Sequence, residues 1–139
     1  GFAFGGAKPV PVNPYNFTVV SPRRGMMLVA IAGPAVNLIL AGVGLVFLHM
    51  FKGVLLPELV EETFIFIFKL NVILMAFNML PVPPLDGSKV LMGLISREAA
   101  LQMMRLEPYG MMILLGMFYF GLLDKVMGGL LDWTRSLLP

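Results

Sequence analysis

The residue with the most evident chemical potential is Asp86, which follows a proline-rich break, PVPP (81–84), at the end of a long apolar run. A carboxylate placed near membrane depth is energetically costly and by default indicates a functional site. Aspartate is also a favoured helix N-cap, so Asp86 could instead cap a short helix that begins at Gly87 and Ser88. The residues by themselves leave both roles open.

Small and polar residues recur at intervals of three or four along the apolar run that starts after Arg24. They share one face of the expected helix, in the order Ala30, Gly33, Asn37, Ala41 and Gly44. Small residues let a second helix approach closely, and an amide in hydrocarbon needs a hydrogen-bond partner. This stripe predicts either a packing seam held together by Asn37 or a polar cavity into which Asn37 donates a hydrogen bond.

Side chains that could bind a metal are scarce. The chain has one histidine, His49, and no cysteine, whereas a catalytic zinc normally takes three protein ligands. His49 stands about 18 Å beyond Asn37 along a helix, and we expect it to be an interfacial side chain. Lys69, inside the second apolar run, is expected to snorkel or to pair with Glu62. We therefore do not expect this chain alone to hold a catalytic zinc.

The composition is that of an integral membrane protein. Of the 139 residues, 58% are hydrophobic and 13% are charged, against about 45–50% and roughly 25% in soluble domains. The apolar residues gather in runs of the length that crosses a bilayer, about 20 residues. The net charge of +2 is small and the basic residues are scattered, which argues against nucleic acid as a partner. The absence of cysteine excludes a disulfide framework and a thiolate metal site.

The sequence predicts an all-α membrane protein. We expect two regions, an extended membrane-surface segment at 1–24 and a transmembrane helical core at 25–139. About three transmembrane helices are expected, at 25–51, 59–80 and 108–130. Between the second and third lies a re-entrant or interfacial segment, 81–107, with a short helix over 88–95. The tail after residue 130 is expected to lie at the interface, anchored by Trp133.

Basic residues flank the expected helices unequally. They precede the first helix and lie between the second and third, at Arg23, Arg24, Lys89, Arg97 and Arg105, while the 52–62 loop is acidic. Cytoplasmic loops carry an excess of Lys and Arg. We therefore expect a multi-pass protein of the cell membrane, with Asp86 toward the cytoplasmic side. Because the chain opens with Gly1, we expect it to be the downstream piece of a longer protein or a trimmed one.

Two motifs resemble those of a known family. GPAVN (33–37) in the first expected helix, and FNMLPVPPLDG (77–87) at the end of the second, resemble the site-2 protease family of intramembrane zinc metalloproteases. The resemblance covers roughly residues 5–95. Either motif alone is modest, but the two in this order and spacing are specific.

The resemblance implies roles for particular residues. In that family an upstream HExxH helix supplies two zinc-binding histidines and a general-base glutamate, so no catalytic residue is expected downstream of Gly1. The Asp of the LDG motif is the third zinc ligand, which corresponds to Asp86. Asn37 and Asn78 correspond to substrate-binding positions. Zinc lowers the pKa of a bound water to about 7, and an extended edge such as 8–17 could pair with an unwound substrate.

Two departures from the family pattern leave an alternative open. HExxH is absent from this chain, and the usual DGG reads Asp86-Gly87-Ser88. We expect the C-terminal half of a zinc metalloprotease that, joined to its HExxH helix, cleaves peptide bonds in or near membrane-spanning segments. By itself this chain is expected to be inactive. The alternative is a non-catalytic membrane module, a pseudoprotease or scaffold subunit. The expected partners are membrane lipid and a transmembrane or membrane-proximal peptide, and not nucleic acid.

Overall fold

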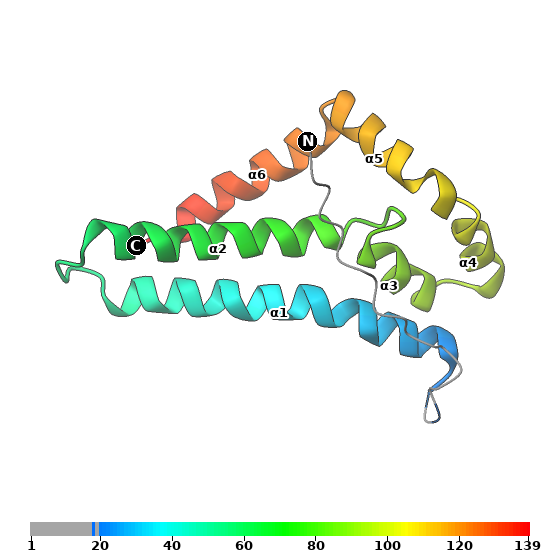
Figure 1. Ribbon diagram of the computed structural model, residues 1–139, viewed down its shortest axis with the longest axis horizontal. Coiled ribbons are helices and arrows are strands. Elements are labelled where there is room, and N and C mark those ends of the chain that lie inside the picture. The colour runs from blue at the N-terminus through cyan, green and yellow to red at the C-terminus, as the bar shows by residue number, and fades with distance from the viewer. Residues whose placement is uncertain (1–17, 19) are drawn as a thin grey trace, which may run out of the picture.

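The computed structural model describes residue 18 and residues 20–139 (Figure 1). The described chain is helical and contains no strand, which confirms the all-α prediction for this part of the protein. The elements are α1 (Pro22–Met50), α2 (Glu58–Asn78), α3 (Asp86–Leu94), α4 (Arg97–Met104), the 3-10 helix η2 (Glu107–Tyr109), α5 (Gly110–Tyr119) and α6 (Leu122–Leu137). The predicted extended stretch over 1–24 lies largely outside the described residues, and its last three residues already belong to α1.

The helices α1 and α2 form a long antiparallel hairpin, joined by the loop 51–57 (Figure 1). A Cβ atom added at Gly44 would lie 3.3 Å from both the Phe64 carbonyl oxygen and the Phe68 nitrogen, so the two backbones approach closely there. Beside this contact the rings of Phe47 and Phe64 stack with centroids 3.6 Å apart. The buried core consists of Ala41, Phe68 and Val72. The packing-seam prediction is confirmed for this half of the small-residue stripe.

The proline-rich break ends α2 and turns the chain into α3. The predicted helix over 59–80 ends at Asn78, two residues early. The Leu85 N–H then donates to the Val82 carbonyl (2.9 Å), which closes a turn whose Pro83–Pro84 bond is cis. A Cβ atom on Gly110 would lie 2.1 Å from the Pro83 oxygen, so the turn rests directly on the start of α5. Non-helical backbone at membrane depth requires such burial in protein.

The prediction of one continuous helix over 108–130 is wrong. The helical segment Arg97–Tyr119 and α6 meet at an angle of 68°. The break falls at Gly121, whose φ of +66° lies in the left-handed region, where glycine carries no steric penalty. Two charged residues, Asp124 and Lys125, follow in the first turn of α6. An apolar run alone therefore did not reveal that the chain changes direction here.

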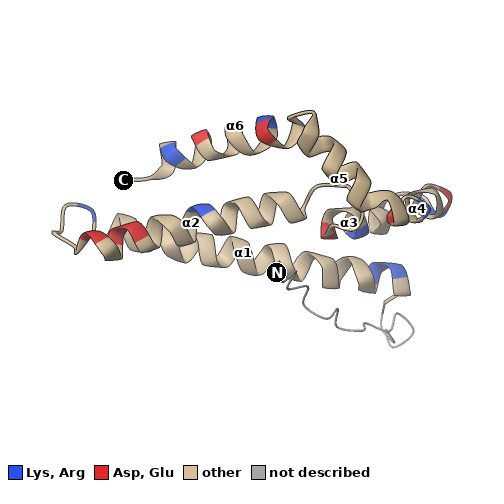
Figure 2. Cartoon of the chain, turned by 45° about the horizontal axis from the view of Figure 1, so that its top comes forward, with Lys and Arg blue, Asp and Glu red and all other residues tan. Residues whose placement is uncertain are grey.

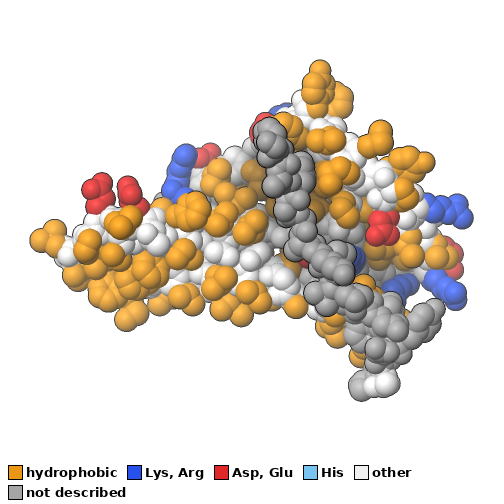
Figure 3. Space-filling model, viewed as in Figure 1, with side chains coloured by type: hydrophobic (Ala, Val, Ile, Leu, Met, Phe, Trp, Pro, Cys, Tyr) orange, Lys and Arg blue, Asp and Glu red, His pale blue; other side chains and the backbone are white. Residues whose placement is uncertain are grey.

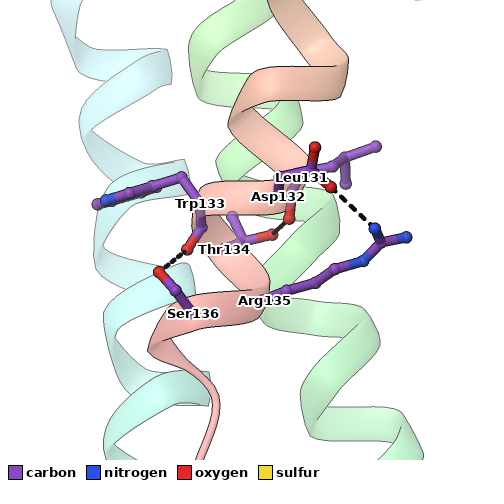
Figure 4. A network of polar contacts seen from close by, with 6 residues as sticks. All are labelled: Leu131, Asp132, Trp133, Thr134, Arg135 and Ser136. Atoms are coloured by element: carbon purple, nitrogen blue, oxygen red, sulfur yellow. Dashed lines mark hydrogen bonds and ion pairs between the residues drawn. The ribbon is translucent and has the colours of Figure 1, made fainter.

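The end of the chain is a helix that packs on the α1–α2 hairpin, and its location at the membrane interface stays a prediction. Helix α6 runs back along α2, and its Leu130 and Leu137, with Leu138, pack on the α1–α2 core (Figure 1). Figure 4 shows the polar contacts of its last turns, in which the fully buried Thr134 hydroxyl donates to the Leu131 carbonyl (2.7 Å). The predicted anchor Trp133 is 55% exposed.

Only part of the predicted membrane topology is supported by helix length and composition. Among the described residues, α1 is long and apolar enough to cross a membrane, and a second crossing is reached if the bent segment from Arg97 to Leu137 counts as one. Helix α2 has 21 residues, but Lys69 and the acids of its first two turns interrupt its apolar run. The count of three spans is therefore not confirmed. Large apolar side chains remain exposed along α1 (Figure 3), such as Leu38 (58%) and Ile39 (64%).

Charges collect at the two ends of the α1–α2 hairpin. Arg23 and Arg24 at the start of α1 lie at the same end as α3 and α4, where further basic residues stand (Figure 2). The acids that open α2, Glu58, Glu61 and Glu62, lie at the other end (Figure 2). The grouping of basic residues that the sequence predicted is thus present in the fold.

Candidate functional site

Asp86 stands at the first position of α3, directly after the proline-rich turn. The N-cap is Leu85, and no side chain caps this helix. The capping role considered for Asp86 is therefore wrong, because the helix starts one residue earlier than that role requires. A carboxylate in the first turn still interacts favourably with the positive end of the helix dipole. The side chain of Asp86 is 33% exposed, so its oxygens remain accessible.

The Asp86 carboxylate faces Gly33 of α1. A Cβ atom added at Gly33 would lie 3.5 Å from Asp86 Oδ2, which is ordinary van der Waals contact. Gly33 opens the GPAVN motif and Asp86 belongs to the LDG motif, so the fold brings together two motifs from helices far apart in the sequence. Since glycine has no side chain, only the backbone of α1 faces Oδ2 at this position.

The second carboxylate oxygen of Asp86 is held by Lys89. The Lys89 Nζ lies 3.2 Å from Asp86 Oδ1, with the side chains 37% and 33% exposed. Lys89 also lines a cavity of about 350 Å³, together with Met26, Met92 and Met104. Sequence reasoning used Lys89 only as a marker of orientation. The signal for the contact was present, because residues three apart on a helix are neighbours.

Close backbone contacts fix the first turn of α3. A Cβ atom at Gly87 would lie 2.3 Å from the Met79 oxygen and 2.5 Å from the Leu80 oxygen, so only glycine fits against the end of α2. Gly87 therefore permits the tight backbone beside Asp86. Ser88 is 1% exposed, and its hydroxyl donates to the Leu85 carbonyl at 2.7 Å.

Arg23 fixes the opposite end of α3. Its Nη2 donates to the carbonyl of Gly93 (3.2 Å) and also to that of Ile95. These are carbonyls at the helix C-terminus, which lack intrahelical partners and attract cations. Helix α3 is thereby tied to α1 through Arg23 and to α2 through Gly87, which leaves Asp86 little freedom to move.

The two predicted substrate-binding asparagines lie near this site. Among the described residues, neither forms a hydrogen bond with Asp86. Asn37 lies one helical turn after Gly33 on α1 and is half-buried. Its side-chain amide makes no hydrogen bond to another described residue. Asn78 is the last residue of α2, directly before Met79, and is also half-buried. Their roles in substrate binding stay predictions.

The other polar residues singled out in the sequence lie away from Asp86. His49 is exposed near the far end of α1, where its Nδ1 lies 3.1 Å from the Leu45 carbonyl oxygen. The ion pairs among the described residues are Asp86–Lys89 and Asp132–Arg135, so the considered pairing of Lys69 with Glu62 is wrong. The buried Asn71 amide donates to the Ile67 carbonyl of its own helix at 2.8 Å.

The chemistry of the site fits one ligand of a metal centre. In the part of the chain that the structure describes, no three or more His, Cys, Asp or Glu side chains gather where they could share a metal ion. Asp86 offers a carboxylate with one oxygen engaged by Lys89 and the other facing an open helix surface. Such a carboxylate can serve as a zinc ligand.

Comparisons with known proteins agree with this geometry. The model of Peptidase family M50 matches residues 48–120, a range that includes the proline-rich turn, Asp86 and Lys89. The chain belongs to this family, the site-2 proteases, which confirms the family that the two motifs predicted. The family is one of membrane-associated metalloproteases. No solved structure matches the chain.

Two curated relatives extend the comparison. "Putative zinc metalloprotease YwhC" of Bacillus subtilis is 36% identical to this chain over an alignment that covers 96% of the chain and 63% of the relative. "Putative zinc metalloprotease MJ0611" of Methanocaldococcus jannaschii is 47% identical over 63 residues, which are 45% of this chain and 31% of that protein. The chain thus spans less than two thirds of the length of either relative.

Proposed function

We propose that this chain is the part of an intramembrane zinc metalloprotease that supplies the third zinc ligand, Asp86, and part of the substrate-binding surface. The two histidine ligands and the general-base glutamate would come from an HExxH helix outside these 139 residues. The whole protein would hydrolyse peptide bonds in or near membrane-spanning segments. One observation carries the proposal, namely that Gly33 of the GPAVN motif meets the Asp86 carboxylate.

The chain's own residues would act by positioning. Zinc, when bound, would supply a polarised water for attack on a peptide carbonyl. Asp86 would hold the metal from the start of a helix whose first turn is fixed by Gly87 and whose last turn is fixed by Arg23. Asn37 and Asn78 would offer side-chain amides to a substrate backbone, because an unwound segment has unpaired N–H and C=O groups that need partners in hydrocarbon.

We place the protein in the cell membrane with the Asp86 end toward the cytoplasm. Helix α1 is long and apolar enough to cross the bilayer. The basic residues gather at the end of the hairpin that bears Asp86, and the acids of α2 lie at the other end (Figure 2). Excess positive charge marks the cytoplasmic side. The apolar surface of α1 (Figure 3) would contact lipid or a neighbouring helix.

The test joins this chain to an HExxH-bearing membrane helix. Zinc content per polypeptide and cleavage of a model transmembrane peptide are then measured for the parent and for Asp86→Ala. We expect Asp86→Ala to lose both bound zinc and cleavage, because two histidines alone leave a catalytic zinc one ligand short. Asp132→Ala, which removes the acid of the ion pair on α6, serves as the matched control and should retain both.

If Asp86→Ala kept full zinc content and cleavage, the ligand assignment would be wrong. If the joined protein bound no zinc although its HExxH helix was intact, the non-catalytic membrane module would replace the protease.

A further inference from the structure

The Asp86 carboxylate has two distinct oxygens. Oδ1 lies 3.2 Å from Lys89 Nζ, while Oδ2 points to α1, 3.5 Å from the place where a Gly33 Cβ would stand. One oxygen is thus engaged by a cation on its own helix, and the other faces a helix surface without a side chain.

We propose that Lys89 and Gly33 are positioning residues for the metal ligand, and that together they make Oδ2 the single oxygen through which Asp86 binds zinc. This inference rests on the proposed function and deepens it. Ligating carboxylates are themselves held by hydrogen bonds, and loss of such an outer partner typically lowers metal affinity about 10–100-fold. Lys89 supplies this bond, and Gly33 keeps the approach to Oδ2 open.

The local structure allows Lys89 to act in this way. Its ammonium reaches Oδ1 from one turn further along α3, a helix whose two ends are tied to α1 and α2. Lys89 also lines the methionine-rich cavity, and a lysine can place its methylene groups against such an apolar surface. A rigid helix and a supported side chain both favour one fixed orientation of the carboxylate.

Gly33 leaves the space in front of Asp86 Oδ2 free of a side chain. A Cβ atom there stands in ordinary contact with Oδ2, so alanine fits, but any longer side chain has to occupy the space in front of that oxygen. Gly33 is exposed, so a larger residue can be accommodated by the fold itself. The consequence of a larger residue should therefore fall on metal binding rather than on stability.

The experiment measures zinc affinity by competition with a chelator, in the protein that carries both this chain and the HExxH helix. We expect Lys89→Met to weaken zinc binding about 10–100-fold, and Lys89→Arg to restore it, because arginine keeps the charge and the donor. Arg135→Met removes the other ion pair with the same i,i+3 spacing and should leave zinc affinity unchanged. The melting temperature of the metal-free protein should be the same for Lys89→Met and for the parent.

Gly33 is tested in the same assay. Gly33→Leu should weaken zinc binding, and Gly33→Ala should not. Gly42→Leu is the matched control on the same helix, since a Cβ atom there meets nothing within 4 Å.

The outcomes distinguish a failure of the proposed function from a failure of the inference about Lys89 and Gly33. Unchanged zinc affinity in Asp86→Ala would defeat the proposed function itself. A large loss in Asp86→Ala, with no change in Lys89→Met, would overturn the inference and leave the proposed function standing. Tighter zinc binding in Lys89→Met would also overturn it, because the ammonium would then compete with the metal rather than orient its ligand.

Discussion

At the scale of single residues, Gly87 is one of the positions at which the fold leaves no room for a side chain. A Cβ atom at this position would stand 2.3 Å from the Met79 carbonyl oxygen, which is backbone and cannot rotate away. We expect Gly87→Ala to lower the free energy of unfolding by about 1–3 kcal/mol or more, as overpacking does. The measurement is thermal unfolding in detergent, followed by circular dichroism.

Gly116→Ala provides the matched control for this substitution. Gly116 also lies in a helix, α5, but a Cβ atom there meets nothing within 4 Å. Alanine is favoured over glycine in helices by about 0.5–1 kcal/mol, so this variant should be neutral or more stable. Equal destabilisation of the two variants would show that close packing at Gly87 is not the cause.

Residue types and spacing predicted much of the site. The rarity of an acid after a proline-rich break singled out Asp86, and the shared periodicity of the stripe placed Gly33 and Asn37 on one face of α1. The contact between Gly33 and Asp86 was not predictable from local pattern, because it depends on how α3 packs against α1. The N-cap was misplaced by one residue, since Leu85 has no capping side chain to mark the start of α3.

At the scale of elements, the bend between α5 and α6 depends on Gly121. Its φ is +66°, and a residue with a Cβ atom adopts such a backbone conformation at a steric cost of about 1–2 kcal/mol. Gly121→Ala should therefore destabilise the protein by roughly that amount or straighten the bend, as seen by a changed distance between spin labels on α5 and α6.

Gly128→Ala is the control for the bend. Gly128 lies within α6, and a Cβ atom there meets nothing within 4 Å. This variant should keep both the stability and the label distance of the parent. A Gly121→Ala variant that behaved in the same way would refute the role assigned to the left-handed glycine.

The close packing of α1 against α2 can be tested by a substitution at Gly44. Gly44→Leu should lower the free energy of unfolding by about 1–3 kcal/mol, because the Phe64 and Phe68 backbone lies 3.3 Å from the Cβ position. Gly42→Leu, with open space at its Cβ position, should have little effect in the same unfolding assay. A similar loss in both variants would contradict the close approach of the two helices at Gly44.

The local sequence predicted some helices well and others poorly. Apolar runs bounded by prolines and charges gave α1 and α2 with ends within three residues of those observed. The same reasoning joined α5 and α6 into one helix, because hydropathy does not register a backbone angle. It also did not predict that α6 packs on α2, since this packing is a tertiary contact between helices far apart in the sequence.

At the scale of the whole molecule, the proposed orientation can be read by chemical labelling. The chain has no cysteine, so each introduced cysteine reports alone. In intact cells, a membrane-impermeant maleimide should label Val54→Cys, in the loop between α1 and α2, and should not label Leu101→Cys on α4 until the membrane is opened. Both parent residues are more than half exposed, at 57% and 51%.

A third position tests whether the bent pair crosses the membrane. Pro139 lines the same small cavity as Gly53 and Val54, so Ser136→Cys should be labelled from the same side as position 54. Labelling of positions 54 and 101 from one side would exclude a crossing by α2. The reverse pattern at all three positions would invert the proposed orientation.

The contact between Gly110 and the proline-rich turn connects the start of α5 to the segment that leads into Asp86, the proposed metal ligand. The Pro83 oxygen lies 2.1 Å from the place of a Gly110 Cβ atom, and Asp86 follows directly after the turn. We expect a tilt of α5 to displace the turn, and with it the Asp86 carboxylate, because the two backbones are in direct contact.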